Sequence, residues 1–315
     1  MRRILKTLGT GRYWHDELLP YWHEGTDYTW TKLDLQEGDN EIYVYYGSST
    51  ATDESNGDDV FEFFDDFEGT DLDPNKWGTI ENTNYSVESS YFKAWGGWDQ
   101  DGIFSAATFD LSEGIVVEWK GRLGVTGADV DLYVGFTPDK SSSGDENIVA
   151  TFYDSQGTAE PYHQKQILYK VGGTSDQTGY GLPNTTNWVR MTSTFTQTQT
   201  VFTDEILGTH TKSKTVSWSS VYLTIGADSD DAARYGYIDW LAVRKYSSSP
   251  PSISYSSEES GSWTIDGHVF TKRKKVTITA SQSVEGYQVR LSYSQWNDPN
   301  LRILHRVTKY IRGDF

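Results

Sequence analysis

Aromatic and polar side chains gather in a short segment around residue 95, and together they could bind a sugar. An aromatic ring can pack on the apolar face of a pyranose, while carboxylates and amides can hydrogen-bond to its hydroxyls. The turn-rich sequence at 95–98 (Trp-Gly-Gly-Trp) favours exposure of an indole, although aromatic residues also pack in sandwich cores. The candidate carbohydrate site consists of Tyr91, Trp95, Trp98, Asp99, Gln100 and Asp101.

Other residue patterns that could support catalysis or metal binding are missing from the sequence. The chain has no cysteine, which excludes disulfides, thiolate nucleophiles and cysteine-ligated metals. The six histidines show neither metal-site spacing nor a linked nucleophile, and we interpret them as surface or packing residues. We interpret the Arg312-Gly313-Asp314 tripeptide as structural, and Asn84 and Asn184 begin sequences that fit glycosylation acceptors.

Composition narrows the class of protein and of partner. The 315 residues carry a formal net charge of −18, so a nucleic acid would be repelled by most of the surface. No run of about 18 apolar residues exists, which predicts no membrane span. With 12 Trp, 21 Tyr and 29 Gly, the chain favours strands and turns over helical bundles.

Short alternating segments fill the region from residue 61 to residue 246. Ile115, Val117 and Trp119 alternate with polar residues, and the segments 130–136 and 221–225 repeat the pattern. A period of two places one face of each strand in a core and the other in water, so the series predicts a β-sandwich.

Linkers divide the chain into four parts, predicted as 1–60, 61–246, 247–252 and 253–315. The Ser/Pro sequence 247–252 cannot join a central strand. Strands are predicted at 41–47, 275–279 and 287–291. A C-terminal helix is predicted from its N-cap Asp298, Pro299 at the first position, an apolar stripe and a stop signal at Gly313. The stripe comprises Leu301, Leu304, Val307 or Thr308, and Ile311.

The central part resembles the concanavalin A-like lectin and glucanase superfamily. The resemblance lies in the sequences 63–69 (Phe-Phe-Asp-Asp-Phe-Glu-Gly) and 72–77 at its start and 236–243 (Gly-Tyr-Ile-Asp-Trp-Leu-Ala-Val) at its end. It implies an all-β jelly roll in which the first and last strands lie side by side.

The flanks resemble a domain of unknown function from archaeal and bacterial surface proteins. The sequences 19–24 and 42–47 are similar to its closing half, and 273–278 and 287–291 to its opening half, in inverted order. The halves could close within the chain as a smaller β-rich domain that includes the C-terminal helix, which we favour because neighbouring ends of the jelly roll would hold the two halves a short distance apart and so raise their effective concentration. They could instead complete a neighbouring chain, giving a homo-oligomer by tail-to-head contact, or belong to a longer tandem array.

The superfamily resemblance also implies a structural calcium ion. Asp239 stands at the position of the family's late-strand aspartate. A hard cation needs several oxygen ligands, which here would be Asp239 and groups of Phe64, Asp66 and Gly96. The alternative is an aspartate that caps a turn.

Catalysis by glycoside hydrolysis is the rival hypothesis. Laminarinase-type members of the superfamily carry paired acids on one strand, but the nearest sequence here, 129–133, has Tyr133 in place of the second Glu. We therefore expect no catalytic residues.

These observations predict a noncatalytic, lectin-like or adhesive protein that binds a glycan or polysaccharide at a cell surface, outside the cell or on a virion. The first alternative is a structural subunit of a filament, sheath or virion fibre, and the second is a laminarinase-like glycoside hydrolase.

Overall fold

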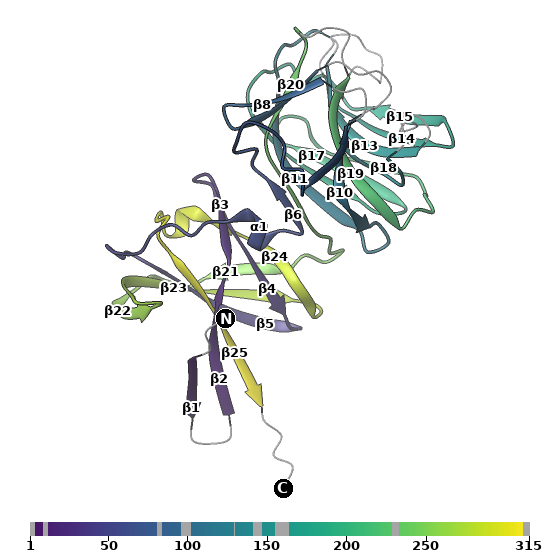
Figure 1. Ribbon diagram of the computed structural model, residues 1–315. Coiled ribbons are helices and arrows are strands. Elements are labelled where there is room, and N and C mark those ends of the chain that lie inside the picture. The colour runs from purple at the N-terminus through teal and green to yellow at the C-terminus, as the bar shows by residue number, and fades with distance from the viewer. Residues whose placement is uncertain are drawn as a thin grey trace. The chain divides into compact units, whose positions relative to one another are not determined.

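The chain folds into two compact units, one formed by residues 62–246 and the other by residues 1–61 together with 247–315. A computed structural model describes residues 4–8, 12–80, 84–95, 102–128, 130–140, 147–154, 164–228 and 233–310. It is almost entirely β, which confirms the predicted fold class (Figure 1).

Residues 62–246 form a sandwich of two antiparallel sheets, the predicted jelly roll. The first sheet has the strand order β15-β14-β13-β12-β19-β10-β7. Its strands are β7 (Trp77–Ile80), β10 (Ile103–Asp110), β12 (Asp131–Thr137), β13 (Asn147–Tyr153), β14 (Gln166–Val171), β15 (Thr174–Gly179) and β19 (Ser220–Asp228).

The second sheet has the order β18-β17-β16-β11-β20-β9-β8, with β6 also paired to β20. Its strands are β6 (Phe63–Asp65), β8 (Asn84–Glu88), β9 (Tyr91–Trp95), β11 (Ile115–Leu123), β16 (Val189–Phe195), β17 (Gln199–Asp204), β18 (Gly208–Ser213) and β20 (Gly236–Lys245).

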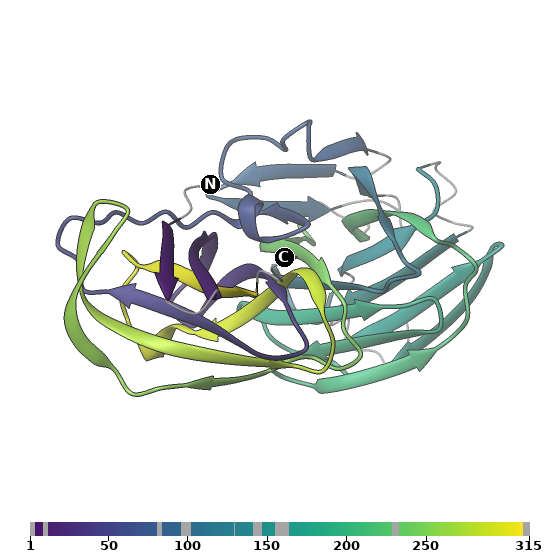
Figure 2. The ribbon, with the colours of Figure 1, turned by 90° about the horizontal axis from the view of Figure 1, so that it is seen from below.

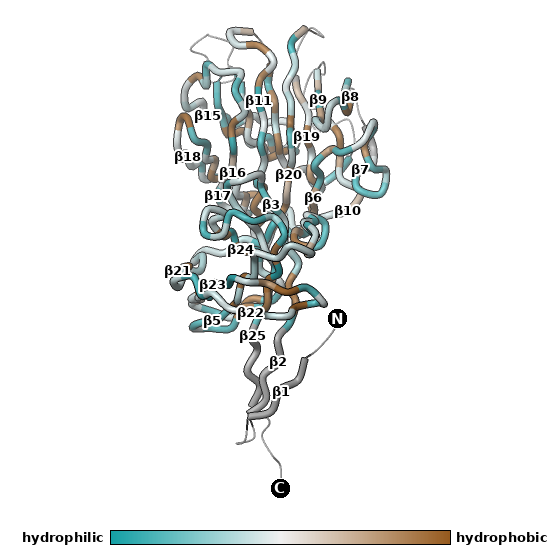
Figure 3. The backbone as a smooth tube through the Cα atoms, turned by 90° about the vertical axis from the view of Figure 1, so that its left-hand side faces the viewer, coloured by the Kyte–Doolittle hydropathy of each residue, from teal (hydrophilic) through white to brown (hydrophobic). Residues whose placement is uncertain are grey.

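The sandwich core is built by the alternation that the sequence shows. Val117 and Trp119 of β11, Val134 of β12 and Leu223 of β19 all point into one buried apolar cluster. Hydrophobic residues accordingly colour stretches of β11, β19 and β20 brown in Figure 3. Burial of one face of each strand is what joins the two sheets.

The first and last strands of the sandwich lie side by side, as the resemblance implied. Phe64 of β6 is paired with Ala242 of β20, and Asp65 with Leu241. The buried Asp65 carboxylate accepts hydrogen bonds from the Trp77 indole at 2.6 Å and from the Phe67 backbone at 2.8 Å. These bonds fasten the loop that follows β6 to the start of β7.

The other unit contains a larger and a smaller sheet. The larger has the order β1-β2-β25-β5-β23-β21 with β22 beside β23, and the smaller has the order β24-β4-β3. The larger comprises β1 (Ile4–Leu8), β2 (Arg12–Leu19), β5 (Gly38–Tyr46), β21 (Ser252–Tyr255), β22 (Glu259–Ile265), β23 (His268–Ala280) and β25 (Arg302–Tyr310). The smaller comprises β3 (Tyr21–Glu24), β4 (Tyr28–Leu35) and β24 (Val284–Ser292); a short helix, α1 (Gly57–Val60), and a 3₁₀ turn, η3 (Tyr293–Gln295), complete the unit.

Strands from the two ends of the chain pair directly in this unit. The purple β5 and the yellow-green β23 run antiparallel from the pair Tyr46–Lys272 to the pair Gly38–Ala280 (Figure 2). β4 pairs with β24 in the same way. The N- and C-terminal segments therefore build one core, with Ile42 and Val44 packed in the same cluster as Val276 and Val289.

The predicted C-terminal helix is wrong. The described part of its apolar stripe lies instead in and beside β25, which pairs with both β2 and β5, and Ile311 lies outside the described residues. Ile303 packs in the core shared by the two sheets, whereas Leu304 packs with Tyr43 and Phe270 in a separate cluster. Consecutive residues thus enter two cores, which a strand permits and a helical stripe does not. Asp298 still caps a turn by accepting a hydrogen bond from the Asn300 backbone at 2.9 Å.

A buried ion cluster spans three strands on the outer side of the second sheet of the sandwich. Glu118 of β11, whose side chain is 2% exposed, lies 2.7 Å from both Arg190 of β16 and Arg244 of β20. The Thr192 hydroxyl donates to the same carboxylate at 2.7 Å. Burial acts to raise the pKa of Glu118, but the two arginines and the hydrogen bonds outweigh burial and lower the pKa to about 2.

We predict that Glu118→Gln lowers the free energy of unfolding by about 3 kcal/mol, because two arginines would face a neutral amide in a buried site. A depressed carboxyl pKa stabilises the fold above the unfolded-state pKa. The stabilisation is lost as the pH falls from about 4.5 toward 2, where the carboxylate becomes protonated. Urea unfolding between pH 7 and pH 3 measures both effects.

Glu88→Gln is the matched control, since its ion pair with Lys93 is partly exposed to solvent and should contribute under about 1 kcal/mol. Equal stability losses in the two variants would contradict the role assigned to Glu118.

Candidate functional site

The described part of the predicted carbohydrate site lies on the outer side of β9. Phe92 and Ala94 point into the core, so Tyr91, Lys93 and Trp95 point out from the same strand. The other four predicted residues, Trp98, Asp99, Gln100 and Asp101, lie outside the described residues.

Three further aromatic rings join this surface from neighbouring segments. Trp188, immediately before β16, lies 4.8 Å from Tyr91, measured between ring centroids. Tyr237 of β20 lies 6.3 Å from each of these rings and 5.2 Å from Tyr235. We define the aromatic face as Tyr91, Trp95, Trp188, Tyr235 and Tyr237, all of which are partly exposed.

The register of three neighbouring strands determines where the aromatic face lies. Tyr237 is paired with Lys93 of β9 on one side and with Arg122 of β11 on the other, so their side chains form a row across three strands. Gly124 lets the Tyr235 ring lie directly on the backbone, because a Cβ at that position would collide with the ring.

Cations lie over these rings. The Arg122 guanidinium is 4.6 Å from the centroid of Tyr237 and 4.9 Å from that of Trp188. Lys93 Nζ is 4.4 Å from the Tyr235 centroid and 5.4 Å from that of Trp95. Cation–π contacts of this kind hold rings and cations in place at a partly exposed surface.

Two carboxylates complete the surface. The Tyr237 hydroxyl donates to Glu88 at 3.2 Å, and Lys120 lies 2.8 Å from Asp239. Burial, followed by the interaction with Glu88, raises the pKa of Tyr237 to about 12, so the phenol remains a donor at neutral pH. The surface therefore combines ring faces with hydrogen-bond donors and acceptors, which is the chemistry that a sugar needs.

No pattern in the sequence had pointed to Trp188, Tyr235, Tyr237 or the cations that hold them. Buried and partly exposed positions alternate at the start of β20. Because Gly236 and Ile238 are buried, the alternation would have placed Tyr235 and Tyr237 on the outer side of the sheet. Their proximity to Tyr91 depends on which strands are neighbours, and that information is not local in the sequence.

The predicted calcium ligands are spread along β20 and β6. Phe64 is paired with Ala242, three residues from Asp239, which is about 10 Å along a strand. Asp66 accepts from the Glu68 backbone at 3.4 Å, Asp239 pairs with Lys120, and Gly96 lies outside the described residues. Within the described ranges, no three His, Asp or Glu side chains form a group that could hold a metal ion. The calcium site stays a prediction.

The strand that would carry a hydrolase's acid pair is β12. Tyr133 lies on the outer side of β12 and is fully buried. Its ring is 5.1 Å from the Phe152 ring, and it packs in an apolar cluster with Ile148 and Leu168. Where the hydrolase pattern needs a carboxylate, the strand thus presents a phenol packed among apolar side chains.

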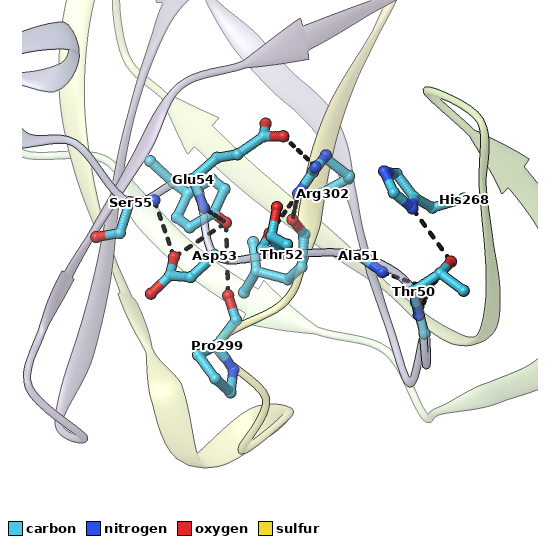
Figure 4. Close-up of polar contacts among 12 residues, drawn as sticks. Thr50, Ala51, Thr52, Asp53, Glu54, Ser55, His268, Pro299 and Arg302 are labelled. Atoms are coloured by element: carbon cyan, nitrogen blue, oxygen red, sulfur yellow. Dashed lines mark hydrogen bonds and ion pairs between the residues drawn. The ribbon is translucent and has the colours of Figure 1, made fainter.

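A second polar cluster lies in the unit built from both ends of the chain, around residues 50–55 (Figure 4). The Tyr21 hydroxyl accepts from the Glu54 backbone at 2.9 Å, and Asp53 accepts from the Ser55 backbone at 2.8 Å. Arg302, whose side chain is 1% exposed, donates to the Thr52 carbonyl at 3.2 Å and pairs with Glu54.

His23 belongs to the same cluster. Its ring nitrogens contact the Thr29 hydroxyl at 3.0 Å and the Pro299 carbonyl at 3.2 Å. Burial lowers the pKa of His23, so its imidazole is neutral at pH 7. The polar groups are engaged in holding the 50–55 segment against β25, which indicates a structural cluster.

We predict that Arg302→Met lowers the free energy of unfolding by about 2 kcal/mol, because buried carbonyls lose a charged donor. Amide hydrogen exchange of residues 50–55 should accelerate, and mass spectrometry of the exchanged peptides measures it. Lys272→Met, which removes an exposed pair with Glu258, is the control and should change neither quantity. Unchanged exchange in Arg302→Met would show that the guanidinium does not hold the segment.

Comparisons with known proteins match parts of the chain. A family described as a domain of unknown function (DUF2341) matches residues 13–80. No curated protein matches the chain. No helix among the described residues is long and apolar enough to cross a membrane.

Solved structures that match part of the chain include two glycan-degrading enzymes and a pseudo-enzyme. A pseudo β-1,3-glucanase of Mycobacterium tuberculosis is 11% identical, with a TM-score of 0.45, over 60% of this chain and 100% of its own. An endo-β-galactosidase from Clostridium perfringens is 14% identical, with a TM-score of 0.43, over 61% and 65%. Porphyranase B from Zobellia galactanivorans is 11% identical, with a TM-score of 0.40, over 57% and 90%. Identities this low do not transfer a function.

Proposed function

We propose that this protein is a noncatalytic carbohydrate-binding protein and that the aromatic face is its binding surface. The observation that carries the proposal is the convergence of five partly exposed rings from three segments of one sheet. Rings that served only to fill the core would be fully buried, whereas these rings are partly exposed to solvent. Arg122 and Lys93 also hold the rings in place before a ligand binds. A preorganised surface loses little side-chain entropy on binding.

The apolar surroundings of Tyr133 support a binding role over hydrolysis. Retaining hydrolysis needs two carboxyl groups about 5 to 5.5 Å apart, and inverting hydrolysis needs them about 6.5 to 9.5 Å apart. On the outer side of β12, Tyr133 lies between Asp131 and Gly135 and packs against Phe152. Hydrolysis of β-glucans by the purified protein, lost in Asp131→Asn, would contradict the proposal.

A location outside the cell or on its surface accords with a polysaccharide ligand and with the acidic composition. The filament alternative has no support in the structure, since β5, β23, β4 and β24 complete one core within a single chain.

We predict that Trp188→Ala and Tyr237→Ala each weaken polysaccharide binding at least tenfold, or about 1.4 kcal/mol, because each removes a ring from the centre of the face. Glycan arrays in the presence of calcium identify the ligand, and isothermal titration calorimetry measures its affinity.

Trp263→Ala is the matched control, since this partly exposed indole belongs to the other unit and should leave affinity unchanged. Binding that survives loss of both central rings would exclude the aromatic face, and failure to bind any glycan would exclude the function.

A further inference from the structure

A lysine and an aspartate are buried against each other inside the sandwich. Lys165 directly precedes β14 of the first sheet, and Asp204 ends β17 of the second. Lys165 Nζ lies 2.5 Å from Asp204 Oδ2, and both side chains are 0% exposed. This separation is shorter than the usual distance of about 2.7–2.9 Å between an ammonium nitrogen and a carboxylate oxygen.

Two aromatic side chains, Phe202 and Tyr153, interact with the pair. Lys165 Nζ lies 4.5 Å from the centroid of the Phe202 ring. The Tyr153 hydroxyl is buried without a hydrogen-bond partner among the described residues. Burial, reinforced by the charge of Asp204, raises the pKa of Tyr153, so this phenol stays protonated. Burial also lowers the pKa of Lys165, which favours the neutral, nucleophilic amine.

Hydrogen bonds orient both groups. Asp204 Oδ1 accepts from the backbone amides of Ile206 and Leu207, each at 2.7 Å. Lys165 Nζ also contacts the Gly208 carbonyl at 2.7 Å. Two amides on Oδ1 would stabilise negative charge that develops there, as an oxyanion hole does, while Oδ2 remains next to the amine.

We propose that Lys165 and Asp204 condense into an intramolecular isopeptide bond between Nζ and Cγ. The physical reason is that two desolvated charges are costly to bury, whereas the amide that replaces them is neutral. The enclosed site also holds the reacting atoms together, which raises their effective concentration.

The step balances without an added reactant. A proton passes from the ammonium of Lys165 to Oδ2 of Asp204, leaving a neutral amine and a carboxylic acid. The Nζ lone pair attacks Cγ, and the developing charge on Oδ1 is held by the amides of Ile206 and Leu207. The Cγ–Oδ2 bond then breaks, and the departing hydroxyl takes a second proton from Nζ and leaves as water. No group is oxidised or reduced.

The bond would join the two sheets of the sandwich covalently. β14 is hydrogen-bonded only to strands of the first sheet, and β17 only to strands of the second, among the pairings of the described residues. An amide between Lys165 and Asp204 would give this cysteine-free chain the kind of cross-link that a disulfide supplies elsewhere.

Intact-mass spectrometry of the full chain under denaturing conditions tests the proposal. The mass should be 18 Da below that of the sequence, after allowance for the initiator Met. Tryptic digestion should yield a branched peptide joining residues 141–170 to residues 191–212, because trypsin cannot cleave after an acylated Lys165. Lys165→Arg keeps the charge, removes the nucleophile and should restore the full mass.

Lys212→Arg is the matched control, since Lys212 lies 2.6 Å from a partly exposed aspartate, Asp176, and should retain the loss of 18 Da. A wild-type mass equal to that of the sequence would overturn the proposal, whether or not Lys165→Arg folds. A loss of 18 Da that persists in Lys165→Arg, as succinimide formation at Asp266-Gly267 would give, would overturn it as well.

Discussion

Closure of each unit by strands distant in the sequence is the constraint on which the rest of the structure depends. β6 pairs with β20 across most of the central segment, and β5 pairs with β23 across nearly the whole chain. The entropic cost of bringing such segments together rises only slowly with their separation, so burial of two apolar faces can offset it. The aromatic face and the buried ion clusters owe their geometry to these pairings.

The aromatic face shows this dependence most directly. Tyr237 meets Arg122 and Lys93 because β20 lies between β11 and β9, and a slip of one residue would turn its ring toward the core. The same β20 carries Arg244 to Glu118, so one strand supports both the candidate binding surface and a buried ion cluster. The candidate binding surface and the ion cluster therefore both depend on the register of one strand, although different side chains form them.

Charge is handled differently in the two buried clusters of the sandwich. Glu118 is surrounded by two arginines and a hydroxyl, and its charge is compensated by several donors at once. Asp204 also accepts from two backbone amides, but its cationic partner is a single buried amine, Lys165, which lies beside the Phe202 ring and whose pKa is lowered by burial. This contrast is the physical reason for assigning electrostatic stabilisation to the first cluster and covalent chemistry to the second.

The sequence by itself determined the all-β class, the strands at 115–123 and 275–279 and the adjacency of the jelly roll's two ends, because alternation and end motifs are legible locally. It also named Tyr91 and Trp95 as candidate sugar-binding residues. Only the tertiary structure decided that residues 302–310 form a strand, because Ile303 and Leu304 find two separate cores that no local period reveals. It alone brought Trp188 to Tyr91 and Lys165 to Asp204, since such contacts depend on which strands become neighbours and which face the opposite sheet.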